Sequence, residues 1–123
     1  MNFAQAITAG FRNYVNFTGR ASRSEFWFWV LFAILVSIAA TLIDVMLFSD
    51  SEMSPLSTLA GLALLLPNLS VSVRRLHDLD RSGWWVLLGL IPIVGLIIII
   101  IWNCSKGTPG PNRFGPDPLA GMA

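Results

Sequence analysis

The sequence predicts an all-α membrane protein: a small bundle of about three transmembrane helices, with an N-terminal amphipathic interfacial helix and an irregular Gly/Pro-rich tail. Hydrophobic residues make up 54% of the 123 residues and charged residues only 12%, about half the charged fraction of a soluble domain. The apolar residues gather in three long segments, 26–48, 56–73 and 84–102. A chain this small could not bury so much apolar surface in water. We therefore expect residues 1–123 to form a single integral membrane domain.

The predicted amphipathic helix lies within residues 1–25, which also contain a capping loop. Phe3, Ile7, Phe11 and Tyr14 recur at helical spacing, with polar residues on the other faces. We expect this helix to lie in the membrane interface with its apolar side down. Packing on the protein's own loops is the alternative.

The first predicted span, 26–48, has a clear start signal. Ser22 and Glu25 fit the S-x-x-E capping box directly before the apolar run. The segment has 23 residues, and about 20 suffice to cross the hydrocarbon. Its one charged residue, Asp44, lies about one turn from the far end. We expect this carboxylate to reach the interface, and a functional role for it is the less favoured alternative.

The second and third predicted spans each contain a proline. Pro67 predicts a kink in the second half of 56–73. The third segment, 84–102, has no charged residue and has Pro92 near its middle. We favour a full crossing for it because each half alone is too short to cross. A re-entrant hairpin that turns at "IPIVG" is the alternative.

The tail, 103–123, is rich in Gly and Pro and has few apolar residues to bury, so it should be extended or irregular. Arg113 and Phe114 in its segment "NRFGPDP" are the residues through which the tail would contact the rest of the protein.

The positive-inside rule sets the predicted orientation. Arginines precede the first span and follow the second, at Arg12, Arg20, Arg23, Arg74, Arg75 and Arg81, and the first connection has none. The N-terminus and the second connection should therefore be cytoplasmic. Three crossings would place the tail outside. The basic residues Lys106 and Arg113 on that tail go against the positive-inside rule in this arrangement. A re-entrant third segment would return the tail to the cytoplasm and remove this objection.

The connector, "RRLHDLDRSGWW" at residues 74–85, can be explained by structure alone. Its arginines stop translocation and contact lipid phosphates, and its two tryptophans anchor the next segment. Asp80 or Ser82 would cap that segment. If the preceding helix continues past the membrane surface, Arg74 and Asp78 can pair at i,i+4.

The same connector also allows a binding site. Arg74, Arg75, His77, Asp78 and Arg81 fall within eight positions. Neighbouring arginines make a good receptor for a phosphate or carboxylate. A histidine beside an aspartate could carry a proton near neutral pH.

Motifs for catalysis are missing from the sequence. There is no nucleophile–base–acid set, no phosphate-binding glycine loop and no Cys/His metal pattern. The one cysteine, Cys104, cannot form an intrachain disulfide, and no basic run suggests nucleic acid. We expect no enzymatic activity, no catalytic residues, no metal and no cofactor.

Four motifs in order along the chain make the sequence resemble a known family. They are "FTGRASRSEFWFW" (17–29), "RRLHDLDRSGWW" (74–85), "IPIVG" (91–95) and "GPNRFGPDP" (110–118). The resemblance is to the YhaH-like proteins grouped as domain of unknown function 805, and it covers nearly the whole chain. It implies a small multi-pass protein of the bacterial inner membrane. It implies no activity, because the function of the family is unassigned.

The resemblance also indicates which positions carry the family pattern. They are Gly19, Arg20, Ser22, Arg23, Glu25, Trp27, Arg74, Arg75, His77, Asp78, Ser82, Gly83, Trp84, Asn112, Arg113, Gly115 and Pro118. Family motifs at both cytoplasmic helix junctions favour a shared polar site. We expect the first motif to meet the connector at the cytoplasmic surface, with Glu25 paired to a connector arginine. The candidate binding cluster is Arg20, Arg23, Glu25, Arg74, Arg75, His77, Asp78 and Arg81.

Two functions remain open at this stage. The favoured one is a binding or scaffolding module whose polar cluster holds an anionic lipid headgroup or a partner membrane protein. A homo-oligomer is also plausible, because Ala33, Ser37 and Thr41 could pack a helix pair. The alternative is a subunit of a small transporter or channel, since proline-broken spans are typical of transport paths.

Overall fold

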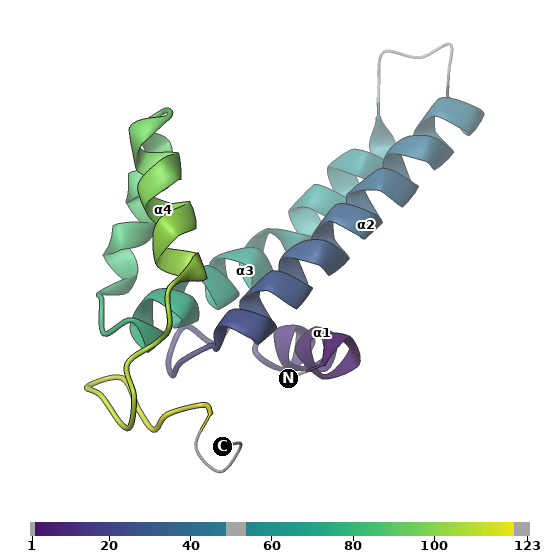
Figure 1. The fold of residues 1–123 in the computed structure, drawn as a ribbon. Coiled ribbons are helices and arrows are strands. Elements are labelled where there is room, and N and C mark those ends of the chain that lie inside the picture. Colours follow the sequence, from purple (N-terminus) through teal and green to yellow (C-terminus); the bar gives the residue numbers. More distant parts are fainter. Residues whose placement is uncertain (1, 49–53, 120–123) are drawn as a thin grey trace.

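The computed structural model describes residues 2–48 and 54–119, and these residues form five helices. The helices are α1 (Phe3–Arg12), α2 (Arg23–Leu47), α3 (Pro55–Asp78), the 3₁₀ helix η1 (Gly83–Leu90) and α4 (Val94–Cys104). In Figure 1, α2 and α3 form a long helical pair that α1 crosses near its lower end, while η1 and α4 stand together as a shorter, separate pair. Within the described ranges the only β pairing is an isolated bridge between Asn112 and Gly115.

The first two predicted spans are confirmed as long apolar helices. α2 has 25 residues and α3 has 24, and both are long and apolar enough to cross a membrane. The two helices are antiparallel, because Thr41 contacts Ser57 at one end (3.2 Å between the Oγ atoms) and Glu25 contacts Arg74 at the other. The predicted kink at Pro67 stays a prediction, although the proline does lie inside α3.

The start of α2 follows only half of the predicted capping box. The Ser22 hydroxyl accepts the Glu25 backbone N–H at 3.3 Å. The Glu25 side chain does not return to the cap, because it pairs with Arg74 on α3. A guanidinium carries a full positive charge and a backbone N–H does not, so the ion pair is the stronger of the two bonds open to this carboxylate. This explains why the second half of the box is absent.

Asp44 connects the far ends of α2 and α3. Its carboxylate accepts the backbone N–H groups of Leu56 (3.0 Å) and Ser57 (2.8 Å), and the side chain is buried against them. These are unpaired donors of the first turn of α3, whose own N-cap residue, Ser54, makes no side-chain cap bond. Asp44 therefore caps the following helix. The connection that follows Asp44, residues 49–53, lies outside the described residues.

The amphipathic helix is confirmed as α1, and it packs on helices rather than on loops. The close approach depends on Gly10, where a Cβ atom would collide with the indole ring of Trp29. Phe11 meets the same ring edge to face, with centroids 5.4 Å apart. After the helix, the Ser70 hydroxyl on α3 contacts the backbone carbonyls of Asn13 (2.8 Å) and Asn16 (2.5 Å).

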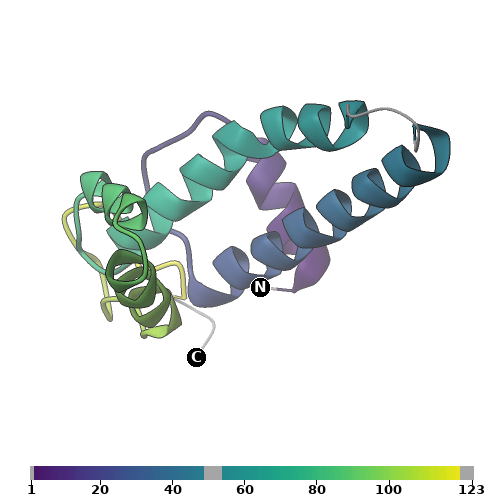
Figure 2. The ribbon, with the colours of Figure 1, turned by 90° about the horizontal axis from the view of Figure 1, so that it is seen from above.

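Residues 84–102 do not form the single spanning helix that the sequence favours, and they follow the alternative, a hairpin that turns at "IPIVG". η1 ends at Leu90, Ile93 adopts a positive φ of 66°, and α4 starts at Val94. The two arms fold back on each other: Trp85 and Trp102 are in edge-to-face contact, with centroids 5.8 Å apart, and Figures 1 and 2 show the arms side by side. Pro92 lacks a backbone donor and disfavours helical geometry in the residue before it, which favours a break in the helix at this position.

The buried core is small and lies at the connector end of α2 and α3. It consists of Ala21, Phe26, Trp29, Leu64 and Val71. Most large apolar side chains elsewhere are exposed, and none of the residues Gly83–Leu90 is buried. An apolar surface of this extent is unfavourable in water and suits a bilayer.

Candidate functional site

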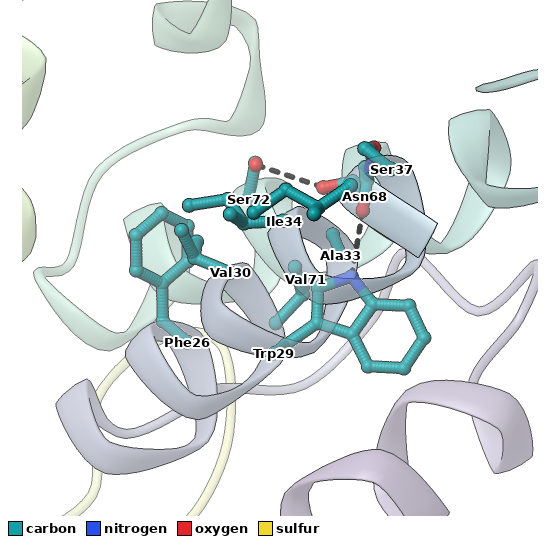
Figure 3. Close-up of a pocket in the computed structure, with 10 residues that line it drawn as sticks. Phe26, Trp29, Val30, Ala33, Ile34, Ser37, Asn68, Val71 and Ser72 are labelled. Atoms are coloured by element: carbon teal, nitrogen blue, oxygen red, sulfur yellow. Dashed lines mark hydrogen bonds between the residues drawn. The ribbon is translucent and has the colours of Figure 1, made fainter. Parts of the chain in front are cut away.

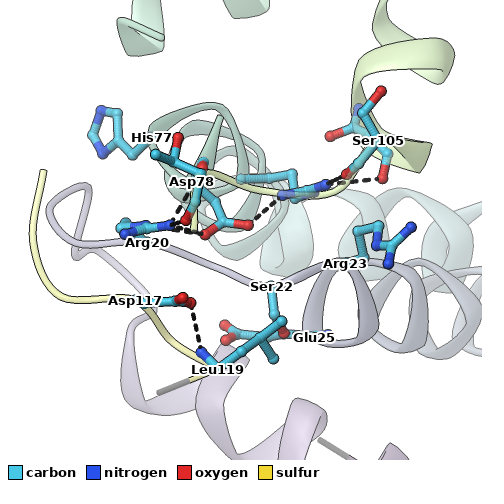
Figure 4. Close-up of polar contacts among 12 residues, drawn as sticks. Arg20, Ser22, Arg23, Glu25, His77, Asp78, Ser105, Asp117 and Leu119 are labelled. Atoms are coloured by element: carbon cyan, nitrogen blue, oxygen red, sulfur yellow. Dashed lines mark hydrogen bonds and ion pairs between the residues drawn. The ribbon is translucent and has the colours of Figure 1, made fainter. Parts of the chain in front are cut away.

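A buried polar cluster joins the start of α2, the end of α3 and the tail (Figure 4). In its first ion pair, Nη1 of Arg74 lies 2.5 Å from the Glu25 carboxylate, and both side chains are more than nine-tenths buried. The Arg74 Nε–H also donates to the Ser70 hydroxyl at 3.3 Å. The predicted pairing of Glu25 with a connector arginine is confirmed.

The second part of the cluster is an aspartate held between two arginines. Asp78 lies 2.9 Å from Nη2 of Arg20 and 2.6 Å from Nη1 of Arg75, and all three side chains are buried. The predicted pairing of Arg74 with Asp78 is therefore wrong. Successive helical residues point about 100° apart, so Arg74 faces α2 while its neighbour Arg75 reaches Asp78.

The two arginines that hold Asp78 also bind backbone carbonyls. Arg20 donates to the carbonyls of Thr108 (2.5 Å) and Gly110 (2.7 Å) in the tail. Arg75 donates to the carbonyls of Asn103 (3.3 Å) and Ser105 at the end of α4. Cations near the C-terminal carbonyls of a helix are favourable. The ion pairs thus hold the hairpin and the tail in place. We call Arg20, Glu25, Arg74, Arg75 and Asp78 the closed cluster.

The tail returns to the connector. The Thr108 backbone N–H donates to the Asp78 carbonyl at 2.7 Å, and the Asn112 side-chain amide donates to the His77 carbonyl at 2.9 Å. The Phe114 ring stacks on the His77 ring with centroids 4.0 Å apart. The tail therefore packs beside the connector, at the end of the molecule from which the hairpin starts. The side of the membrane on which it lies stays a prediction.

The predicted contacts of Arg113 and Phe114 with the body are confirmed. Arg113 donates to the Asp80 carbonyl at 3.1 Å and pairs with its carboxylate at 3.3 Å. Further along, the carboxylate of Asp117 accepts the backbone N–H groups of Leu119 and Gly110, which lowers its pKa because these bonds favour the charged form.

The remaining predicted site residues lie outside the closed cluster. Nδ1 of His77 is 2.9 Å from the Gly19 carbonyl oxygen, and its ring is covered by Phe114. The Arg81 guanidinium lies over the Trp102 ring, 4.0 Å from the centroid. Arg23 is exposed and donates to the Cys104 carbonyl at 3.1 Å. The eight predicted residues therefore divide into a buried ion-pair network and separate groups around it.

Some members of the site could not be found from the sequence. Thr108, Gly110 and Ser105 contribute backbone carbonyls, and any residue type supplies a carbonyl. Ser70 and Asn103 carried a weak signal, since each is a polar residue in or next to an apolar segment. In the described part of the chain, no group of three His, Cys, Asp or Glu side chains is placed to hold a metal ion.

Two grooves lie on the surface of α2. One, of about 390 Å³, is lined by Arg23, Ser24, Trp27, Phe28 and Leu31. The other, of about 330 Å³, lies between α2 and α3, and its polar residues are Ser37, Asn68 and Ser72 (Figure 3). The first joins a cation to an apolar surface, and the second is apolar except for these three residues.

Comparison with known proteins agrees with the motifs. Residues 14–116 match the family described as "Protein of unknown function (DUF805)". The chain is 50% identical to "Inner membrane protein YhaH" of Escherichia coli over 109 residues, which are 87% of this chain and 90% of the relative. It is 43% identical to "Inner membrane protein YhaI" of the same organism over 110 residues, which are 89% of this chain and 92% of the relative. No solved structure matches the chain. The chain therefore belongs to the DUF805 family and is a helical protein of the bacterial inner membrane.

Proposed function

We propose that this protein is a non-enzymatic binding module that holds an anionic phospholipid at the cytoplasmic face of the inner membrane. The observation that carries the proposal is the position of Arg23. Its guanidinium is exposed at the head of an apolar groove formed by Trp27, Phe28 and Leu31 of the same helix. An anionic phospholipid would match both features, with its phosphate at the charged Arg23 and an acyl chain along the apolar groove.

The proposal assigns the connector and both termini to the cytoplasm. Arginines flank this end of α2 and α3, and the segment 48–55 between the helices contains none. The tail docks on the connector, which supports the same side for both. α4 has 11 residues, about 16 Å of helix, which is roughly half of the hydrocarbon thickness. The η1–α4 pair is thus proposed as a hairpin that enters the membrane and returns.

This topology has a direct test. A reporter that is active only in the periplasm and a reporter that is active only in the cytoplasm are each fused after residue 123 of the full chain. The hairpin predicts activity of the cytoplasmic reporter alone. Activity of the periplasmic reporter alone would mean that the third segment crosses fully.

The closed cluster explains why Arg23 and not the other arginines is assigned to the lipid. Arg20, Arg74 and Arg75 are buried, and each pairs with a carboxylate inside the protein. Arg23 makes a single hydrogen bond, to a carbonyl, and among the described residues no carboxylate pairs with it. Figure 4 shows its guanidinium apart from the network around Asp78. Arg23 therefore has free donors for a phosphate.

The surroundings of Arg23 favour a lipid over a soluble anion. Trp27 lies one turn below it and donates its indole N–H to the Asn103 carbonyl at 3.1 Å, and tryptophan prefers the headgroup level of a membrane. Lys106 and Arg81 add positive charge at the same end of the molecule, and this charge attracts the anionic cytoplasmic leaflet.

Native mass spectrometry of the detergent-solubilised full chain, titrated with phosphatidylglycerol or phosphatidylcholine, tests the proposal. We expect the wild type to retain phosphatidylglycerol preferentially. Loss of one interfacial arginine removes about 1 kcal/mol, so Arg23→Ala should weaken this binding roughly fivefold. Arg12→Ala is the matched control, because Arg12 is exposed on α1 and does not line the groove.

Three results would contradict the proposal. They are equal retention of the two lipids by the wild type, retention of phosphatidylglycerol unchanged in Arg23→Ala, and displacement of the lipid by inorganic phosphate. The last result would assign Arg23 to a soluble anion.

A further inference from the structure

A cavity of about 470 Å³ lies between α3 and η1. This volume is within the range of small-molecule sites, roughly 300–1,000 Å³. Its lining is mainly apolar, with Leu69 from α3, Leu87 from η1 and Phe17 from the loop after α1. His77 and Ser82 add polar side chains, and none of the described residues that line the cavity is Lys, Arg, Asp or Glu.

His77 brings a buried hydrogen-bond acceptor to this cavity. The residue is only 8% exposed. Its Nδ1 lies 2.9 Å from the Gly19 carbonyl oxygen, and a carbonyl only accepts, so Nδ1 carries the proton. In the neutral ring, Nε2 then has a lone pair and accepts. Phe114 stacks on the ring and holds it in place. Within the described residues, Nε2 has no hydrogen-bond partner.

The free nitrogen selects the headgroup of a ligand. A phosphate would face an acceptor with no cation beside it in the lining, which is unfavourable. An acyl chain alone would leave Nε2 unpaired in a buried site, which costs free energy. A hydroxyl group donates a hydrogen bond and carries no charge. Ser82 adds the complementary group, because its oxygen accepts the Trp84 backbone N–H at 3.4 Å while its own hydrogen is available as a donor.

The polar and apolar parts of the lining lie at different depths. His77 is next to the end of α3, at the connector, whereas Leu69 lies eight residues earlier, about 12 Å along the helix. On the other wall, Ser82 precedes η1 and Leu87 lies within it. The cavity is therefore polar at the connector and apolar further along the span, which is the order of headgroup and chain in a membrane lipid.

We propose that this cavity binds a neutral lipid whose headgroup is a free hydroxyl group, such as a diacylglycerol. The hydroxyl donates to Nε2 of His77 and accepts from Ser82, and an acyl chain extends past Leu69 and Leu87. Arg23 does not line the cavity, so this site is independent of the proposed phospholipid site.

Native mass spectrometry of the detergent-solubilised full chain tests the proposal with two probes, dioleoylglycerol and its acetyl ester. The two probes have the same oleoyl chains, and only the first has a free hydroxyl. We expect the wild type to retain dioleoylglycerol roughly fivefold better, which is the effect of about one hydrogen bond. Equal retention of the two probes, or retention of neither, would overturn the proposal.

Two substitutions remove Nε2, and each keeps one of the other contacts of the ring. His77→Asn keeps an amide N–H close to the position of Nδ1, which can donate to the Gly19 carbonyl. His77→Phe keeps an aromatic ring on which Phe114 can stack. Both variants should lose the preference for dioleoylglycerol over its ester. A preference that persists in either variant would contradict the role of Nε2.

A substitution away from His77 tests the cavity itself. Leu69→Trp places a larger side chain in the apolar part and should lower the retention of both probes severalfold. Leu66→Trp is the matched control, because Leu66 is as exposed as Leu69 (41% and 40%) and does not line the cavity. This control and Arg23→Ala should both retain the probes like the wild type. Unchanged retention in Leu69→Trp, or loss in Arg23→Ala, would place the probes elsewhere on the protein and overturn the proposal.

Discussion

The carboxylate of Glu25, in the first turn of α2, lies 2.5 Å from Nη1 of Arg74, near the end of α3, and both side chains are almost completely buried. The contact ties the beginning of one long apolar helix to the end of the next. A charge in this position is tolerated only with its partner, because the loss of one member leaves the other buried and unpaired.

We therefore expect Glu25→Ala and Arg74→Ala each to lower the free energy of unfolding by about 3–5 kcal/mol, and the double variant to cost clearly less than the sum. The measurement is reversible unfolding in detergent micelles. Arg113→Ala is the control: its ion pair with Asp80 is exposed, and its loss should cost less than about 1 kcal/mol. Additive losses from the two buried sites would show that the pair is not coupled.

Charge reversal should distinguish the two neighbouring arginines of the connector. Arg74→Glu places a carboxylate opposite Glu25, and adding Glu25→Arg should restore part of the lost thermal stability. Arg75→Glu should not be restored by Glu25→Arg, because the partner of Arg75 is Asp78. Equal rescue of both variants would contradict the pairing seen in the structure.

Asp44→Ala should loosen the start of α3. The two backbone N–H groups that the carboxylate accepts, those of Leu56 and Ser57, would lose their partner, and their hydrogen exchange should become faster. Asp44→Asn retains one acceptor oxygen and should have a smaller effect. Unchanged exchange at both amides in Asp44→Ala would mean that the carboxylate does not cap this helix.

Gly107→Ala should release the tail from the connector. A Cβ atom at this position would collide with the Asp78 carboxylate, and overpacking of this kind costs about 1–3 kcal/mol. We expect faster protease cleavage after Lys106 in the variant than in the wild type. Gly61→Ala is a matched control, because a Cβ there meets no atom within 4 Å. Cleavage at the wild-type rate would show that the tail is not held at this position.

Local pattern was enough to predict much of the fold. The length and hydropathy of 26–48 and 56–73 predict the two long helices, and Ser22 marks the start of α2. The spacing of Phe3, Ile7 and Phe11 predicts α1. These features depend on residues close in sequence, so a single chain contains the necessary information.

What the sequence by itself determined is thus the composition, the helices α1, α2 and α3, and a set of polar residues that contains the whole closed cluster, including the pairing of Glu25 with a connector arginine. Only the tertiary structure decided that the partner is Arg74, because adjacent helical residues point in different directions and the packing of α2 selects one of them. It also decided that 84–102 turns back at Pro92, since a span and a hairpin have the same apolar composition. The side chains of Arg113 and Phe114 predicted that the tail docks. The contacts of Thr108 with Asp78 and Arg20 use backbone groups, and a side-chain pattern does not indicate these.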